Sequence, residues 1–209
     1  FSPPAEAPSG QRWGSVVFED TSVDATFSGV DVFEGGSIVE HCTFERGARA
    51  LRIDAASPLV SACTFRDNVV DPDLTVGGAA ILVENGAAPR IVGSSFLDNE
   101  ATGSGYGGAI YVDDAQPVLQ DNRFTGNVSA YGGALTTFAM YSPIVGNTFT
   151  DNDGQWEGGA VSFVSSSPAF LANTVTGNST LLDGGGVHVC VDCYPHANPF
   201  VMDNVVTGN

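Results

Sequence analysis

Hydrophobic and polar residues alternate along the chain in short stretches. Ile110 and Val112 fall on one face of an extended segment, and Tyr111 between them falls on the other. The same alternation recurs in residues 161–163 and 187–189. Alternation over a few residues is typical of a half-buried β-strand, whereas an amphipathic helix repeats its apolar positions every 3.6 residues. The pattern therefore predicts an all-β chain built from short strands.

Two motifs interrupt these stretches at regular intervals. One is a pair of glycines before small and apolar residues, beginning at Gly77, Gly107, Gly132, Gly158 and Gly184. The other is Asn-x-Phe/Val-x-x-Asn, and we call its two Asn positions the ladder slots. The first slot is filled by Asn122, Asn147, Asn173 and Asn204, and in earlier copies by Cys63 and Ser94. The second slot is filled by Asn68, Asn99, Asn127, Asn152, Asn178 and Asn209.

The spacing of the motifs predicts a solenoid. The second slots follow one another at intervals of 25 to 31 residues, and the two slots of one motif are always five residues apart. A repeat of this length with strand-like alternation and glycine corners indicates a right-handed parallel β-helix of about seven or eight coils. Equivalent residues would then stack about 4.8 Å apart, so Asn side chains could bond along the stack and Phe rings could pile up inside.

These repeats carry a resemblance to known families. The Gly-Gly-Ala-Ile and Phe-x-x-Asn elements of residues 42–209 resemble the repeats of polymorphic outer-membrane proteins, whose passenger regions are β-helical surface adhesins. More broadly, the chain resembles the pectin-lyase-like right-handed β-helix superfamily. The resemblance implies the fold, but this fold hosts lyases, hydrolases, tailspikes and inert fibres, so it does not select a function.

The repeats also suggest the domain organisation. Residues 1–10 are predicted to be a Pro-rich N-terminal segment, and residues 11–209 a single β-helix domain. The segment around Trp13 resembles a first coil, and Phe27 and Val30 are expected in the next one. The final ladder slot is the last residue, with no polar cap after it. An uncapped end exposes strand edges, so we expect either a larger parent chain or end-to-end self-association.

The charge of the chain excludes several classes of partner. There are 24 acidic residues against 7 basic ones, all of them Arg, and the net charge is −17. Nucleic-acid binding needs clustered basic residues, so it is excluded. No run of about 18 apolar residues is present, so no transmembrane helix is predicted.

Four cysteines are compatible with an exported protein, at the cell surface or outside the cell. Cys42 and Cys63 occupy the same slot in successive coils, where stacking would bring them within disulfide reach, although two free thiols would also fit. Cys190 and Cys193 stand in a five-residue insertion and form a second candidate disulfide.

The sequence predicts no cofactor, and the residue types leave two metal sites as alternatives. His188, Cys190, Cys193 and His196 could supply a tetrahedral zinc set, an alternative to the disulfide. Acidic residues that precede the second slot, Asp67, Asp98 and Asp151, could share calcium at the coil corners.

Other residues suggest binding or catalysis. Tyr106, Tyr131 and Trp156 lie just before their glycine pairs, so stacking should align them in an outward column able to bind glycans. For catalysis the best acidic pair is Asp113 and Asp114, but no Lys exists, and the hydrolase motifs of the resembled superfamily are missing.

The sequence therefore predicts an extracellular structural or adhesive β-solenoid, which would self-assemble head to tail as a fibre or surface-layer subunit. The alternative is a glycan-binding adhesin passenger fragment. A polysaccharide lyase or hydrolase is the third hypothesis, and no catalytic residue is assigned.

Overall fold

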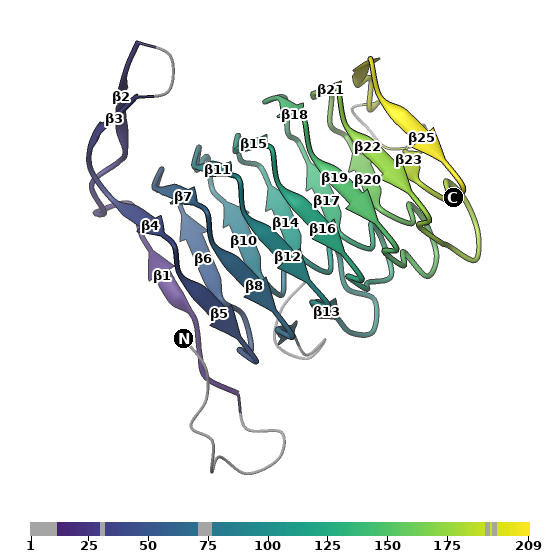
Figure 1. The fold of residues 1–209 in the computed structure, drawn as a ribbon, viewed down its shortest axis with the longest axis horizontal. Coiled ribbons are helices and arrows are strands. Elements are labelled where there is room, and N and C mark those ends of the chain that lie inside the picture. The colour runs from purple at the N-terminus through teal and green to yellow at the C-terminus, as the bar shows by residue number, and fades with distance from the viewer. Residues whose placement is uncertain (1–11, 30–31, 71–76, 191–192, 194–195) are drawn as a thin grey trace.

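The computed structural model describes residues 12–29, 32–70, 77–190, 193 and 196–209. The Pro-rich segment predicted at residues 1–10 and Val30 lie outside these residues. The described chain consists of 25 short strands and no helix, and three seven-stranded parallel sheets hold most of them (Figure 1). This confirms the all-β parallel solenoid.

The strands of each sheet come from successive coils. The first sheet contains β1 (Val16–Phe18), β6 (Leu51–Asp54), β10 (Ile81–Glu84), β14 (Ile110–Asp113), β17 (Leu135–Phe138), β20 (Val161–Val164) and β23 (Val187–Val189). The second contains β4 (Ile38–Glu40), β7 (Leu59–Ser61), β11 (Arg90–Val92), β15 (Val118–Gln120), β18 (Ile144–Val145), β21 (Ala169–Leu171) and β24 (Phe200–Met202). The third contains β5 (Thr43–Glu45), β8 (Thr64–Arg66), β12 (Ser95–Leu97), β16 (Arg123–Thr125), β19 (Thr148–Thr150), β22 (Thr174–Thr176) and β25 (Val205–Thr207).

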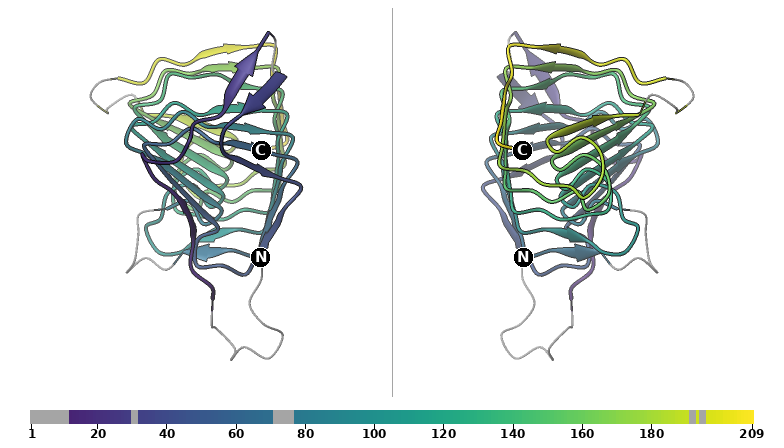
Figure 2. Two further views of the ribbon diagram at one scale, coloured as in Figure 1. Left: turned by 90° about the vertical axis from the view of Figure 1, so that its left-hand side faces the viewer. Right: turned by 90° about the vertical axis from the view of Figure 1, so that its right-hand side faces the viewer.

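Each coil contributes one strand to each sheet and then climbs to the next layer. Figure 2 looks along the stack from both ends and shows the three sheets arranged around a common interior. The sheets define seven layers, of which five lie between two neighbours, so the count stands at the low end of the expected seven or eight. A short pair, β9 (Val69–Val70) and β13 (Glu100–Ala101), adds a parallel ladder beside the third sheet.

Aromatic rings pile up inside the stack as the motif predicts. The rings of Phe44, Phe65, Phe96, Phe124 and Phe149 lie 4.7–5.0 Å apart, nearly parallel, and all five side chains are buried. The column continues through Val175 and Val206. The apolar core is therefore one continuous cluster along the solenoid axis.

The two Asn ladders are confirmed. In the second slot, each Asn Nδ2 donates to the Oδ1 of the next layer's Asn at 2.8–2.9 Å from Asn68 to Asn209. In the first slot, the corresponding distance is 3.1 Å from Asn122 to Asn204. The interior amides are buried, so each ladder satisfies polar groups that water cannot reach.

One segment departs from the predicted coil. Residues expected around Phe27 to continue the solenoid form instead an antiparallel hairpin of β2 (Thr26–Ser28) and β3 (Val32–Gly35), which projects from the N-terminal end (Figure 1). Phe27 packs edge-on against Phe33 at 6.1 Å, and Arg90 lies over its ring at 4.7 Å. The placement of Phe27 in a coil is therefore wrong, because its ring finds an apolar partner within the hairpin.

A buried hydroxyl of the first sheet lacks a partner within the described part of the chain. Thr137 is fully buried between Val112 and Phe163, and its Oγ1 has no hydrogen-bond partner among the described residues. We expect Thr137→Val to raise the free energy of unfolding by about 1 kcal/mol in urea titrations, because Val keeps the shape and removes an unsatisfied polar group. Thr136→Val is the matched control and should destabilise, because its Oγ1 accepts a hydrogen bond from the Gly107 amide at 3.0 Å. A loss of stability in Thr137→Val would contradict this account.

Candidate functional site

The predicted aromatic column of Tyr106, Tyr131 and Trp156 is present, but its rings pack mainly against one another. Tyr106 and Tyr131 stand in register in successive layers, and their rings stack at 5.0 Å. Trp156 meets Tyr131 edge-on at 5.3 Å. The other neighbour of Tyr106 is Tyr111, stacked at 5.5 Å. The three residues therefore lie together as expected, and Tyr106 is enclosed between two rings.

Exposure separates the members of this column. The Trp156 side chain is 39% exposed, whereas Tyr106 and Tyr131 are half-buried and Tyr111 is buried. Burial raises the pKa of Tyr131, and the neighbouring Tyr106 and Glu157 add to the effect. Trp156 is accordingly the member of the column best able to contact a ligand.

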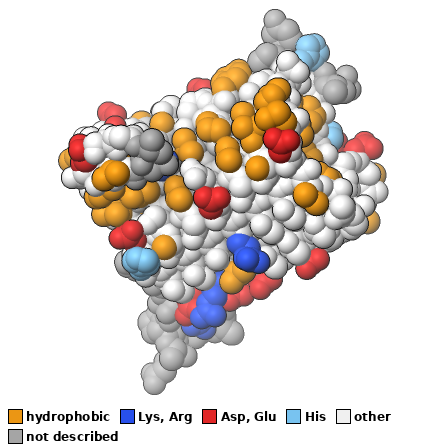
Figure 3. Space-filling model, turned by 45° about the horizontal axis from the view of Figure 1, so that its top comes forward, with side chains coloured by type: hydrophobic (Ala, Val, Ile, Leu, Met, Phe, Trp, Pro, Cys, Tyr) orange, Lys and Arg blue, Asp and Glu red, His pale blue; other side chains and the backbone are white. Residues whose placement is uncertain are grey.

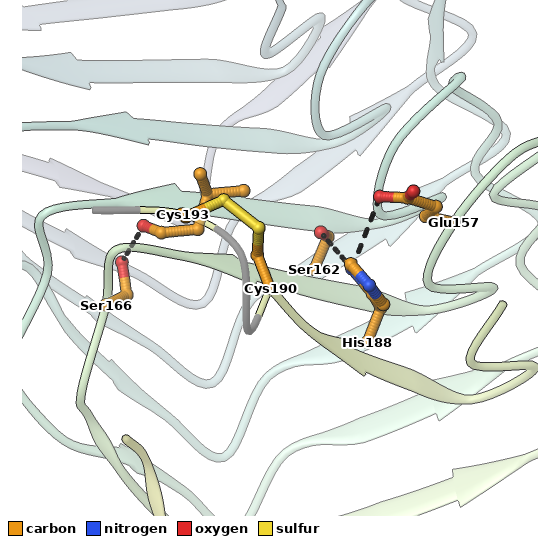
Figure 4. Close-up of a disulfide and its surroundings, with 7 residues drawn as sticks. Glu157, Ser162, Ser166, His188, Cys190 and Cys193 are labelled. Carbon is orange, nitrogen blue, oxygen red and sulfur yellow. Dashed lines mark hydrogen bonds and ion pairs between the residues drawn. A yellow bond between two sulfur atoms is a disulfide. The ribbon is translucent and has the colours of Figure 1, made fainter. Parts of the chain in front are cut away.

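A cluster of three polar side chains, Glu157, Ser162 and His188, lies beside the disulfide between Cys190 and Cys193 (Figure 4). The Nδ1 atom of His188 is 3.3 Å from the Ser162 hydroxyl and 3.4 Å from a carboxylate oxygen of Glu157. Both groups approach the same ring nitrogen, whereas in a catalytic triad the nucleophile and the orienting acid contact opposite nitrogens of the histidine. Ser162 is also completely buried. The cluster therefore fixes the orientation of the imidazole and does not form a nucleophile relay.

The predicted disulfide between Cys190 and Cys193 is present, with Cα atoms 5.6 Å apart. The disulfide uses both sulfurs of the candidate zinc set. Of the four predicted ligands, only His188 and His196 therefore keep the atoms that would bind the metal. Among the described residues, no group of three His, Cys, Asp or Glu side chains is arranged to hold a metal ion. The sequence placed these cysteines correctly, and the geometry favours the covalent alternative over the metal.

Cys42 and Cys63 are not bonded to each other, in contrast to the predicted disulfide. Each thiol is directed at a nearby carbonyl instead: Cys42 Sγ donates to Glu40 O at 3.3 Å, and Cys63 Sγ lies 3.2 Å from Ser61 O. Burial raises the pKa of the Cys63 thiol. The shared slot was identified correctly, but both residues remain free thiols.

Acidic side chains form a row along the first sheet. Asp54, Glu84 and Asp113 occupy the same register position in three successive strands. Arg52 lies against this row, with Nε 2.6 Å from Glu84 and Nη2 2.8 Å from Asp54. The pKa of Asp113 is raised by burial and by the charges of Glu84 and Asp114. Sequence reasoning singled out Asp113 and Asp114 but missed the row, because the row changes between Asp and Glu and the next layer interrupts it with Phe138.

The corner acids predicted to share calcium are not a continuous column. The position of Asp98 is taken in the next layer by Gly126, and Asp151 follows one layer later. A Cβ atom at Gly126 would lie 2.3 Å from an Asp98 carboxylate oxygen, so the aspartate side chain fills the space above the glycine. Only Asp67 and Asp98 stand in adjacent layers, which leaves too few carboxylates for a typical calcium site.

A buried cation escaped sequence reasoning. Arg49 is 7% exposed, and its guanidinium donates to the carbonyls of Gly77 at 2.6 Å and Gly78 at 3.2 Å. Burial lowers the pKa of Arg49 to about 10. Arg49 aligns in register with Ala79 of the next layer. An Arg at a position that holds a small residue in the next repeat is the sequence feature that could have revealed the buried cation. Arg49 ties the corner of one coil to the glycine pair of the next.

Comparisons with known proteins agree with this architecture. The family model described as right handed beta helix region matches residues 10–149 and 76–209. No curated protein and no solved structure matches the chain. Within the part of the chain that the structure describes, no helix is long and apolar enough to cross a membrane. Stacked parallel strands, continuous Asn ladders and a family match over almost the whole sequence lead to one conclusion: the chain belongs to the right-handed β-helix family.

Proposed function

We propose that the protein is an extracellular or cell-surface β-solenoid with a structural and adhesive role. The observation that carries the proposal is that the recurring polar residues connect the layers of the solenoid. The buried Asn side chains bond to one another and to backbone groups of adjacent layers, so the most repeated polar chemistry of the chain holds the stack together. What remains for function is the outer surface.

Two of the outer faces favour contact with other molecules. On the second sheet the outward positions are mainly apolar and half-buried, among them Val92, Val118, Val145, Ala169 and Leu171. Figure 3, with the top of Figure 1 brought forward, shows hydrophobic side chains gathered over this side of the molecule. On the third sheet the outward positions are mainly threonines, including Thr125, Thr148, Thr150, Thr174 and Thr176. Extended faces of this kind suit adhesion or assembly.

The polar clusters argue against catalysis. Arg52 neutralises part of the acidic row, and the His188 cluster has a buried hydroxyl and a doubly contacted Nδ1. General acid–base catalysis needs titratable groups that converge on one accessible point. Incubation with acidic polysaccharides should therefore produce no new double bonds and no reducing ends, and release of either product would revive the enzymatic hypothesis.

The location and role are tested together on native cells. A disulfide persists in oxidising compartments, which supports a site outside the cytosol. We expect an antibody against the chain to label intact, unpermeabilised cells, and we expect beads coated with the protein to adhere to its natural surface. Labelling that appears only after permeabilisation would contradict the location, and beads that adhere no better than albumin-coated beads would contradict the adhesive role.

Glycan binding is the second candidate, because Trp156, which packs against Tyr131, is the partly exposed member of the aromatic column. Aromatic faces stack on sugars. If the column binds glycans, Trp156→Ala should reduce about tenfold the amount of protein retained on a glycan that the wild type binds. The control, Tyr141→Ala, removes another exposed aromatic side chain and should leave this amount unchanged. Equal retention by both variants on a glycan array would reject this candidate.

A further inference from the structure

Two free thiols meet where successive coils stack. Cys42 and Cys63 directly precede β5 and β8, which pair in register through Thr43 and Thr64 (Figure 1). The Thr64 amide donates to the carbonyl of Cys42 at 2.8 Å, so the two cysteines are direct neighbours along the stack. All four cysteines lie in the described part of the chain, and the other two are bonded to each other. Cys42 and Cys63 are therefore the two free thiols of the chain, and they stand together.

The two thiols adopt equivalent positions. Cys42 Sγ lies 3.3 Å from the carbonyl oxygen of Glu40, and Cys63 Sγ lies 3.2 Å from that of Ser61, in each case two residues earlier. Glu40 and Ser61 are themselves paired in register. Burial is the main cause of the raised pKa of the Cys63 thiol, and a side-chain contact with Cys42 adds to it. Both sulfurs therefore project to the same side of the corner, next to each other.

The spacing of the layers suits a bridging ion better than a direct sulfur–sulfur bond. Equivalent atoms of adjacent parallel strands lie about 4.8 Å apart. A disulfide requires the two Cβ atoms to approach to about 3.8 Å, so its formation would draw the coils together at this corner. Two metal–thiolate bonds of about 2.3 Å, the length found for zinc, span about 4.6 Å when they are collinear. A cation between the sulfurs therefore fits the register through side-chain adjustments alone.

The donor set selects the class of cation. Soft thiolate ligands select Cu(I), whereas Zn²⁺ in structural sites takes four ligands. Among the residues that the structure describes, no three His, Cys, Asp or Glu side chains are grouped to hold an ion, so the two sulfurs have to suffice. Closed-shell ions such as Cu(I) form linear complexes with two thiolates. The pair therefore suits a soft cation and does not suit ions that prefer oxygen or tetrahedral ligand sets.

The cation can enter from the side of Cys42. Cys42 is half-buried and lines a cavity of about 380 Å³ together with Val39 and Phe44, whereas Cys63 is 2% exposed. An ion can thus meet the first sulfur from solvent and be enclosed by the second. The net charge of −17 attracts cations to the molecule.

We propose that Cys42 and Cys63 form a two-coordinate site for a soft closed-shell cation of the Cu(I) type, which joins two successive coils at this corner. On binding, each S–H group loses its proton to solvent, two copper–sulfur bonds form, and copper remains Cu(I). The proposal stands on the register of the layers and does not depend on the adhesive role.

The test uses the full chain, purified without thiol reductants so that the disulfide between Cys190 and Cys193 stays intact, and Cu(I) kept reduced by ascorbate. Competition with a chromogenic Cu(I) chelator should give one ion per chain, and X-ray absorption at the copper edge should show two sulfur neighbours. Cys42→Ser and Cys63→Ser should each weaken binding at least about 100-fold. The matched control, Ser94→Ala, loses the hydrogen bond from the Cys63 amide at 3.1 Å but keeps both thiols, and it should bind as the wild type does.

The same experiments can overturn the proposal. Isolation of the native chain without free thiols would show that the pair forms a disulfide. Binding that survives Cys63→Ser, or a copper-dependent dimer in sedimentation, would place the ion between two copies at Cys42. Displacement of Cu(I) by equimolar Zn²⁺ would indicate a tetrahedral site. Affinity that rises about 100-fold per pH unit below the pKa values of the thiols would support the release of two protons, and affinity independent of pH would contradict it.

Discussion

Gly133→Ala is expected to prevent the solenoid from folding or to lower its free energy of unfolding by more than about 4 kcal/mol. A Cβ atom at Gly133 would lie 2.3 Å from the carbonyl oxygen of Gly159 and 2.6 Å from the carbonyl carbon of Asp153. Both neighbours are backbone atoms of the next layer, so the clash is relieved only if the two coils move apart. Separation would break the ladder bonds on either side of the glycine corner.

The matched control is Gly93→Ala. Gly93 has a φ of +59° and open space around the position of a Cβ atom, so Ala adds backbone strain of about 1 kcal/mol and no clash. The measurement is the urea midpoint by circular dichroism, together with the soluble yield. Equal stability of the two variants would show that the layers can separate at the glycine corner without loss.

Asn127→Ala is expected to lower the free energy of unfolding by about 3–5 kcal/mol. The Oδ1 of Asn127 accepts from the backbone amide of Asn99 at 3.1 Å and from its Nδ2 at 2.9 Å. Its own Nδ2 donates to Phe96 O at 3.0 Å and to Asn152 Oδ1 at 2.9 Å. All of these groups are buried, so truncation leaves several of them without a partner and without access to water.

The control for the ladder is Asn209→Ala, at its exposed end. There the side chain accepts from Asn178 and donates to Val175 O, but water can replace the lost partners, so about 1 kcal/mol is expected. Denaturation of both variants in urea measures the difference. Similar losses at the two positions would contradict the idea that burial makes the interior ladder bonds strong.

The repeated features could be read from the sequence because a solenoid makes its long-range contacts at a fixed sequence separation. Phe96 stacks on Phe124, and Asn127 bonds to Asn152, each one repeat further along the chain. Spacing alone therefore predicted the Phe column and both Asn ladders. The Cys190–Cys193 disulfide was also predictable, because its two residues are close in the chain.

The candidate sites were predictable only in part. The sequence aligned Tyr106 with Tyr131, but the enclosure of Tyr106 by Tyr111 and the exposure of Trp156 depend on side-chain packing. It singled out His188 as a candidate zinc ligand, yet it did not reveal the contact of His188 with Glu157, which depends on the path of a loop. A repeat specifies which backbone positions stack and does not specify how non-repeated side chains turn.

By itself, the sequence determined the solenoid, its register and its ladders, because each layer repeats the same local pattern against the layer before it. Only the tertiary structure decided the features that do not repeat: the projecting hairpin of β2 and β3, the free thiols of Cys42 and Cys63, and the enclosure of Tyr106 between Tyr111 and Tyr131. These depend on packing between single residues, such as Trp13 over Phe44, for which the repeat offers no second copy to compare.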